Sequence, residues 1–138
     1  MTHRTSSVLG SFSLLLVAGC ATLGLGGTAP RLLGAYAARL AITGRSTYTG
    51  TLTIARWSGD SAFGTLKLVA PLAVEVAARG RQRSDTLYLL GTYSAANGCI
   101  GTMDASLAVG DGAGRAAGLV TLEDKCVGAL RGSMEISR

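Results

Sequence analysis

The chain has 138 residues, of which 48% are hydrophobic, 20 are glycine and 2 are proline. This length suits one domain with a real core, and the scarcity of proline without a three-residue glycine period excludes a collagen-like chain. The formal net charge is +5, but acidic and basic residues are interspersed, so no basic stripe indicates a nucleic-acid partner.

The N-terminal residues have the organisation of a signal peptide. "MTHRTSS" carries Arg4 and no acid, and the apolar segment Val8–Ala18 follows it. A helix that spans a bilayer needs about 20 apolar residues, whereas the core of a signal peptide needs roughly 7 to 15. The segment is therefore too short to span a membrane and has the length of a signal-peptide core.

A cysteine ends this apolar segment, in the sequence VAGC at residues 17–20. An aliphatic residue, two small residues and a cysteine resemble the lipobox of bacterial lipoproteins, and the resemblance covers residues 1 to about 23. It implies a signal peptide over residues 1–19 and lipidation of Cys20 with a thioether-linked diacylglycerol, usually with an acylated amino terminus as well. Several acyl chains would anchor the protein stably in a membrane.

The same resemblance implies a location in the cell. Ala21 stands where an aspartate often retains such lipoproteins in the inner membrane of Gram-negative cells, so the outer membrane, facing the periplasm, is favoured where the cell has one. The alternative is an ordinary secreted protein with a signal peptide. "ATLGLGGTAPR", after Cys20, is typical of a flexible tether. We expect residues 20–33 to be the lipidated cysteine and tether, and residues 34–138 to be the folded domain.

A short phrase recurs in residues 34–138: a glycine, then Thr or Ser, then Leu, Tyr or Met. It begins at Gly50, Gly64, Gly91, Gly101 and Gly132. In its second copy, Gly64, Leu66 and Leu68 would face one side of a strand, and Thr65 and Lys67 the other. This period of two predicts a half-buried β-strand.

The alternation of inward and outward residues continues along the chain, and turn sequences such as "TGRS", "WSGD" and "GDGAG" separate the alternating segments. Short connections favour antiparallel neighbours, and about eight such strands can close into a barrel. The sequence therefore predicts an all-β fold, an antiparallel up-and-down β-barrel of about eight strands. Inward glycines would let a narrow barrel bend sharply and leave room for bulky neighbours across its interior.

The first strand leaves an alternative open. "RLLGAYAARLAI" alternates like a strand, but it also fits helical spacing through Leu33, Tyr36 and Leu40. Its GAY sequence resembles the glycine-x-aromatic opening of lipocalin-like and avidin-like barrels, which usually have Trp where Tyr36 stands. This resemblance covers three residues and the general spacing of about eight strands, and it implies a barrel without implying a ligand.

Residues for catalysis are scarce. The only histidine, His3, lies in the predicted signal peptide, which excludes a Ser-His-Asp device and any His-ligated metal from the mature chain. Seven carboxylates fall in turns or on the predicted outer face: Asp60, Asp85 and Asp111 in turns, and Glu75, Asp104, Glu123 and Glu135 on that face. We therefore expect neither an enzyme nor a metal or cofactor, with a small carboxylate-dependent hydrolase as an alternative.

Two cysteines remain once Cys20 is set aside. Cys99 and Cys126 each precede a predicted strand, the sixth and the eighth, and these strands run the same way in an up-and-down barrel. Both cysteines would lie at one end of the barrel, in a compartment where disulfides form. The sequence predicts a structural Cys99–Cys126 disulfide. A redox pair is the alternative, although no CxxC spacing exists.

Two hairpin tips carry candidate binding residues. Arg79, Arg81 and Arg83 lie near one tip, and arginine forks bind phosphate and carboxylate groups, as in an anionic headgroup or polysaccharide. The alternative is a solvated turn in which Asp85 is a local partner. Trp57, near another tip, is either an exposed binding aromatic or a partly buried residue at the rim.

These observations favour a lipid-anchored protein of the bacterial envelope that acts as a non-catalytic structural or binding module. Eight strands leave just enough interior for side chains, so we expect a packed or nearly packed barrel. A carrier of a small apolar ligand in the barrel interior is the alternative. The expected partners are the membrane and either an anionic envelope component or an apolar small molecule.

Overall fold

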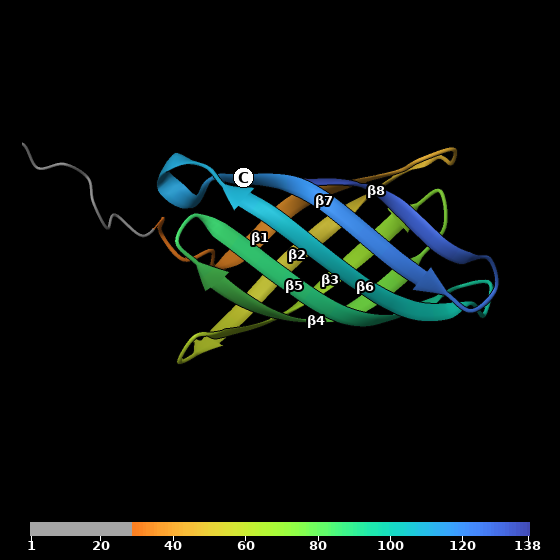
Figure 1. The fold of residues 1–138 in the computed structure, drawn as a ribbon, viewed down its shortest axis with the longest axis horizontal. Helices are drawn as coiled ribbons and strands as arrows, with labels where there is room; N and C mark the ends of the chain where they lie inside the picture. Colours follow the sequence, from red (N-terminus) through yellow and green to blue (C-terminus); the bar gives the residue numbers. More distant parts are fainter. Residues whose placement is uncertain (1–28) are drawn as a thin grey trace, which may run out of the picture.

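The computed structural model describes residues 29–138; Cys20, the predicted signal peptide and most of the predicted tether lie outside them. Eight strands form one closed antiparallel barrel, in which each strand pairs with the next and β8 pairs with β1 (Figure 1). The strands are β1 (Gly34–Ile42), β2 (Thr47–Ser58), β3 (Ser61–Ala70), β4 (Val74–Arg83), β5 (Thr86–Ala95), β6 (Ile100–Val109), β7 (Arg115–Asp124) and β8 (Gly128–Ser137), with a short 3-10 helix, η1 (Asp111–Ala113), before β7.

The predicted all-β, up-and-down barrel of eight strands is confirmed. The segment that also fitted helical spacing is strand β1, because it pairs on both edges, with β2 and with β8. Within residues 29–138 no helix is both long enough and apolar enough to cross a membrane.

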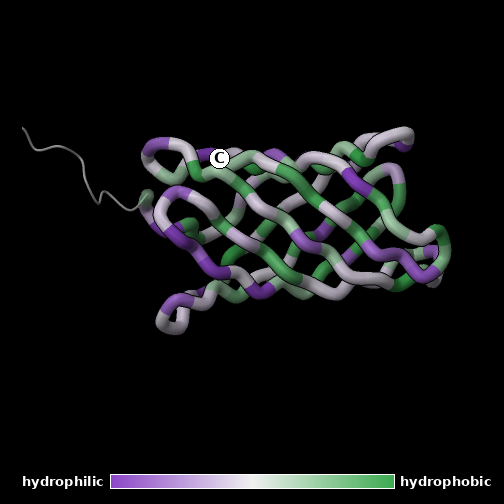
Figure 2. Tube along the Cα trace, in the orientation of Figure 1, coloured by the Kyte–Doolittle hydropathy of each residue, from purple (hydrophilic) through white to green (hydrophobic). Residues whose placement is uncertain are grey.

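The period-two phase decides which side chains are buried. In β6, every second residue from Gly101 to Val109 is buried and each residue between them is exposed. Buried and exposed positions also alternate through the middle of β1 and β4, and Figure 2 shows apolar and polar residues interspersed along the strands. Fully burying one leucine-sized side chain stabilises a fold by about 1.5–3 kcal/mol, so the large side chains inside the barrel supply its main stabilisation.

Several inward glycines allow adjacent backbones to approach closely. A Cβ atom on Gly64 would lie 2.3 Å from the carbonyl oxygen of Thr53 on β2, and one on Gly132 would lie 2.1 Å from that of Ala41 on β1. Strands in a narrow barrel coil strongly, and a glycine lets one backbone bend over its neighbour. The expectation that these glycines leave room for bulky side chains across the barrel is therefore wrong at Gly64 and Gly132, where the neighbouring strand occupies that space.

Residues 29–33 cover one end of the barrel, here called the closed end, where the C-terminus and the β2–β3, β4–β5 and β6–β7 connections also lie (Figure 1). Leu32 is fully buried, and its carbonyl oxygen accepts a hydrogen bond of 2.8 Å from Nε1 of Trp57. Nε2 of Gln82 donates a hydrogen bond of 2.8 Å to the carbonyl oxygen of Ala29. Trp57 is therefore a partly buried rim residue that holds this segment against the barrel.

The opposite end, here called the mouth, is formed by the β1–β2, β3–β4, β5–β6 and β7–β8 connections. A disulfide joins Cys99 to Cys126 there, with 5.8 Å between their Cα atoms, so the predicted disulfide is confirmed. It links the β5–β6 connection to the β7–β8 connection across 27 residues of chain. Closing a loop of this length stabilises the fold by about 3 kcal/mol in the chain-entropy model.

Candidate functional site

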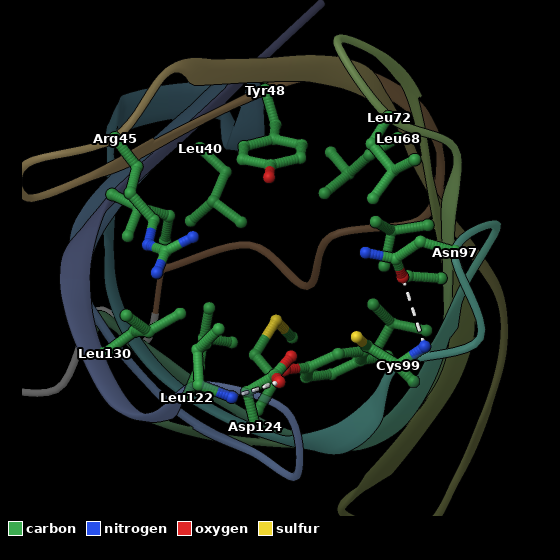
Figure 3. A pocket seen from close by; sticks show the side chains of 17 residues that line it. Leu40, Arg45, Tyr48, Leu68, Leu72, Asn97, Cys99, Leu122, Asp124 and Leu130 are labelled. Atoms are coloured by element: carbon green, nitrogen blue, oxygen red, sulfur yellow. Dashed lines mark hydrogen bonds between the residues drawn. The ribbon is translucent and has the colours of Figure 1, made fainter.

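A cavity of about 100 Å³ lies just inside the mouth (Figure 3). Most of its wall is apolar, because the strands place inward residues at their mouth ends. The main apolar residues of this wall are Leu40, Leu68, Val76, Met103, Leu122 and Leu130. Leu32 and the inner residues of the strands fill the barrel from the closed end to its middle. The interior is therefore packed over most of its length, as expected, but hollow at the mouth.

Tyr93 and Asp124 form a hydrogen-bonded pair in the cavity wall. The Tyr93 hydroxyl donates to Oδ2 of Asp124 over 2.5 Å. Oδ1 of Asp124 accepts hydrogen bonds from the backbone N–H groups of Cys126 at 2.7 Å and Val127 at 3.1 Å. Gly101 is required beside this pair, because a Cβ atom there would lie 2.6 Å from the Tyr93 ring.

This pair shifts both pKa values away from neutrality. Burial, followed by the hydrogen bond to Asp124, raises the pKa of the Tyr93 hydroxyl far above its usual value. The hydrogen bond from Tyr93 lowers the pKa of Asp124, against the opposing effect of burial and with help from two backbone N–H groups. Near neutral pH, Tyr93 is therefore a protonated donor and Asp124 an ionised acceptor.

Three further polar side chains surround the opening: Arg45 from the β1–β2 connection, Tyr48 from β2 and Asn97 from the β5–β6 connection. Figure 3 shows them projecting toward the cavity from different sides. The Arg45 charge contributes to lowering the pKa of Asp124, so the two groups are close enough to interact. Within residues 29–138 the ion pairs are Arg31–Asp60 and Arg115–Glu135, which leaves Arg45 without a carboxylate at ion-pair distance.

The mouth also contains three groups of the kind that bind metals. Atoms of Cys99, Asp124 and Cys126 lie within 4.8 Å of one another. However, the two sulfur atoms are bonded to each other, whereas a cysteine binds a metal as a free thiolate. In this oxidised state the cluster offers a metal one carboxylate, which is already occupied by three hydrogen-bond donors.

Asp124 is a residue of the cavity wall that was not predicted from the sequence. The signal was present, because Val120 and Leu122 face inward and the same period of two continues to Asp124. The seven carboxylates predicted to lie in turns or on the outer face are outside the cavity wall. Among them, Glu135 pairs with Arg115 at 2.6 Å on the outer surface.

The predicted anion-binding arginines lie away from the cavity. Arg79, Arg81 and Arg83 alternate along the outer face of β4, toward the closed end, and all three are exposed. The Arg79 guanidinium carbon lies 5.3 Å from the centre of the Phe63 ring, and that of Arg56 lies 4.2 Å from it. The structure brings these cations together on one outer surface, and their binding of an anion stays a prediction.

The comparisons with known proteins agree on the fold alone. No protein-family model and no curated protein matches the chain. One similar solved structure is a redesigned beta barrel, mFAP1, bound to DFHBI; it is 12% identical, with a TM-score of 0.57 over 78% of this chain and 94% of that one. A second, EF1p2_mFAP2b bound to DFHBI, is 11% identical, with a TM-score of 0.60 over 78% of this chain and 93% of that one. At these identities the likeness supports a small β-barrel and nothing finer.

Proposed function

We propose that this chain is a non-catalytic, lipid-anchored binding protein of the bacterial envelope that holds a small apolar ligand in the mouth cavity. The observation that carries the proposal is an apolar cavity open at one end of a barrel whose other end is covered by residues 29–33. Sites for drug-sized ligands measure roughly 300–1,000 Å³. A cavity of about 100 Å³ fits a short acyl chain or a single ring instead.

Two further observations support a binding role. The similar solved barrels are both bound to the small molecule DFHBI, so a barrel of this architecture is able to hold a ligand. The pair in the cavity wall is poorly suited to proton transfer, because a general acid or base needs a pKa near the working pH. The pKa of Asp124 is lowered and that of Tyr93 is raised, which moves both away from that range.

The position of the N-terminal segment fits the lipid anchor. Residues 29–33 lie on the closed end, so a chain leading back to Cys20 departs from that end. Ala29 lies nine positions after Cys20 (29 − 20), and an extended chain over that span reaches about 30 Å. An anchor at Cys20 would therefore keep the closed end within about 30 Å of the membrane surface.

Methyl NMR of the full chain tests the proposal, with 1-hexanol as the probe. Met103 lines the cavity, whereas Met134 is buried in the core outside the lining. The two methyl groups therefore report on ligand binding and on fold integrity separately. We expect hexanol to shift the Met103 signal in a saturable way and to leave the Met134 signal in place.

A pair of adjacent alanines provides a matched control. Ala95 lines the cavity, so three added carbons in Ala95→Leu fill space that the ligand needs. Ala96 is exposed in the following turn, outside the cavity wall, so Ala96→Leu adds the same atoms to the outside. Hexanol binding should be lost in the first variant and retained in the second. Equal binding by both variants, or no saturable Met103 shift in the unaltered chain, would refute a ligand site at the mouth.

A further inference from the structure

The carboxylate and amide oxygens at the mouth already accept hydrogen bonds from the protein itself. Oδ2 of Asp124 accepts a hydrogen bond from the Tyr93 hydroxyl, and Oδ1 accepts hydrogen bonds from two backbone N–H groups. The side-chain oxygen of Asn97 accepts from the backbone N–H of Cys99 at 3.1 Å. A ligand that brings hydrogen-bond donors would therefore have to compete with bonds that the protein makes to itself.

The donor groups at the mouth are free. Among residues 29–138 the guanidinium of Arg45 takes part in no ion pair and no side-chain hydrogen bond. The Tyr48 hydroxyl and the Asn97 amide nitrogen likewise have no partner in that part of the chain. In Figure 3 these groups project toward the opening of the cavity. The three side chains at the mouth that make no hydrogen bond through these groups thus each carry a donor, and one of the donors is cationic.

The geometry points to a small anionic amphiphile as the ligand of this site: a short apolar body in the cavity, with a carboxylate held at the opening by Arg45. This inference rests on the proposed binding function and adds the chemical class of the ligand. A guanidinium pairs with a carboxylate through two parallel hydrogen bonds. Tyr48 and Asn97 lie beside it as additional donors. The apolar wall would shield one side of the ion pair from water, which strengthens it relative to a fully exposed pair.

Three unbranched probes of six carbons each, with an anionic, a neutral or a cationic head group, test the inference on the full chain. They are hexanoate, 1-hexanol and hexylammonium, each titrated at neutral pH against the Met103 methyl signal. We expect hexanoate to bind most tightly, hexanol next and hexylammonium least. Added salt should weaken hexanoate binding and leave hexanol binding unchanged, because salt screens a charged pair at an exposed opening.

Arg45→Gln removes the charge and keeps a polar side chain at the opening. It should weaken hexanoate binding roughly three- to tenfold, the range for a partly exposed charged hydrogen bond, and leave hexanol binding unchanged. Arg39→Gln is the matched control, because Arg39 is exposed on the outer face of β1 and its loss changes the net charge equally. It should leave the binding of all three probes as it was.

The outcomes separate this inference from the function on which it rests. If none of the three probes binds, the proposed function fails. If all three bind equally, or if Arg45→Gln and Arg39→Gln have the same effect on hexanoate, the cavity binds apolar ligands and the role of Arg45 is refuted. Tightest binding of hexylammonium would also overturn the inference, because it would make Asp124 the recognising group.

Discussion

Gly64 offers a sharp test of how the barrel is packed. In Gly64→Ala the new Cβ atom would lie 2.3 Å from the Thr53 carbonyl oxygen and 3.2 Å from Cα of Ile54, whereas ordinary contacts begin at 3.4 Å. To remove this clash, the new Cβ atom and the Thr53 carbonyl oxygen must move apart by 3.4 − 2.3 = 1.1 Å. The atoms that must move belong to the backbone of β2, which is paired with β1 on one side and β3 on the other. Overpacking costs about 1–3 kcal/mol, and this site should lie toward the upper end.

Gly114→Ala makes the same chemical change in open space. Gly114 has φ −83° and ψ −15°, and no atom within 4 Å of a Cβ placed there. Alanine tolerates that conformation, and it restricts the unfolded chain, so this variant should be neutral or more stable by up to about 1 kcal/mol. The two substitutions should therefore differ by about 2–4 kcal/mol in the free energy of unfolding.

Urea unfolding of the full chain, followed by fluorescence of the single tryptophan, Trp57, measures this difference. In thermal unfolding we expect a midpoint about 10 °C or more lower for Gly64→Ala than for Gly114→Ala, at roughly 4–8 °C for each kcal/mol. Equal midpoints would show that β2 and β3 can separate without cost. The close approach of backbones would then not explain the inward glycines.

Three further predictions concern the disulfide, the Tyr93–Asp124 pair and the N-terminus. Reductant should lower the free energy of unfolding of the native chain by about 3 kcal/mol, and it should not affect a variant that carries Cys99→Ser and Cys126→Ser. The pKa of Asp124 is lower in the folded protein than in the unfolded chain, where it is about 3.9. The ionised Asp124 therefore stabilises the fold above about pH 3.9, and this stabilisation is lost as the pH falls through the folded pKa. Tyr93→Phe should reduce this loss of stability at acid pH, measured as the free energy of unfolding in urea. Intact mass should show acyl groups on the cleaved chain, and Cys20→Ser should abolish them; a wild-type protein without acyl groups would contradict the lipobox assignment.

The strands could be read from the sequence because their signal is local. Alternation at positions such as Leu66 and Leu68 requires no knowledge of the partner strand, and short turn sequences define the up-and-down order. The disulfide followed from that order, since parallel placement of the sixth and eighth strands brings Cys99 and Cys126 to one end. These inferences depend on sequence neighbours alone, and all of them are confirmed.

The mouth could not be assembled in the same way. Arg45 and Asn97 lie in connections, whose side-chain directions do not follow the strand period, and they are brought together with Tyr48 only when the barrel closes. Nothing in the sequence indicated that Leu32 is buried, because Leu32 directly follows "ATLGLGGTAPR", which has the composition of a tether. Partners distant in sequence, Trp57 and Gln82 among them, hold this segment in place. Contacts between distant connections thus determine the candidate site, and they leave little trace in the local pattern.

The topology of the barrel also affects the order of folding. Seven of the eight strand pairings join neighbours in the chain, and such pairs close loops of a few residues. The pairing of β1 with β8 brings together residues as distant as Ala37 and Ser137, so it carries the largest loop-closure entropy. We expect a growing meander of hairpins, with the seam between the first and last strands forming last. In pulse-labelled hydrogen exchange during refolding, amides that bond across this seam should gain protection after those of β5 and β6.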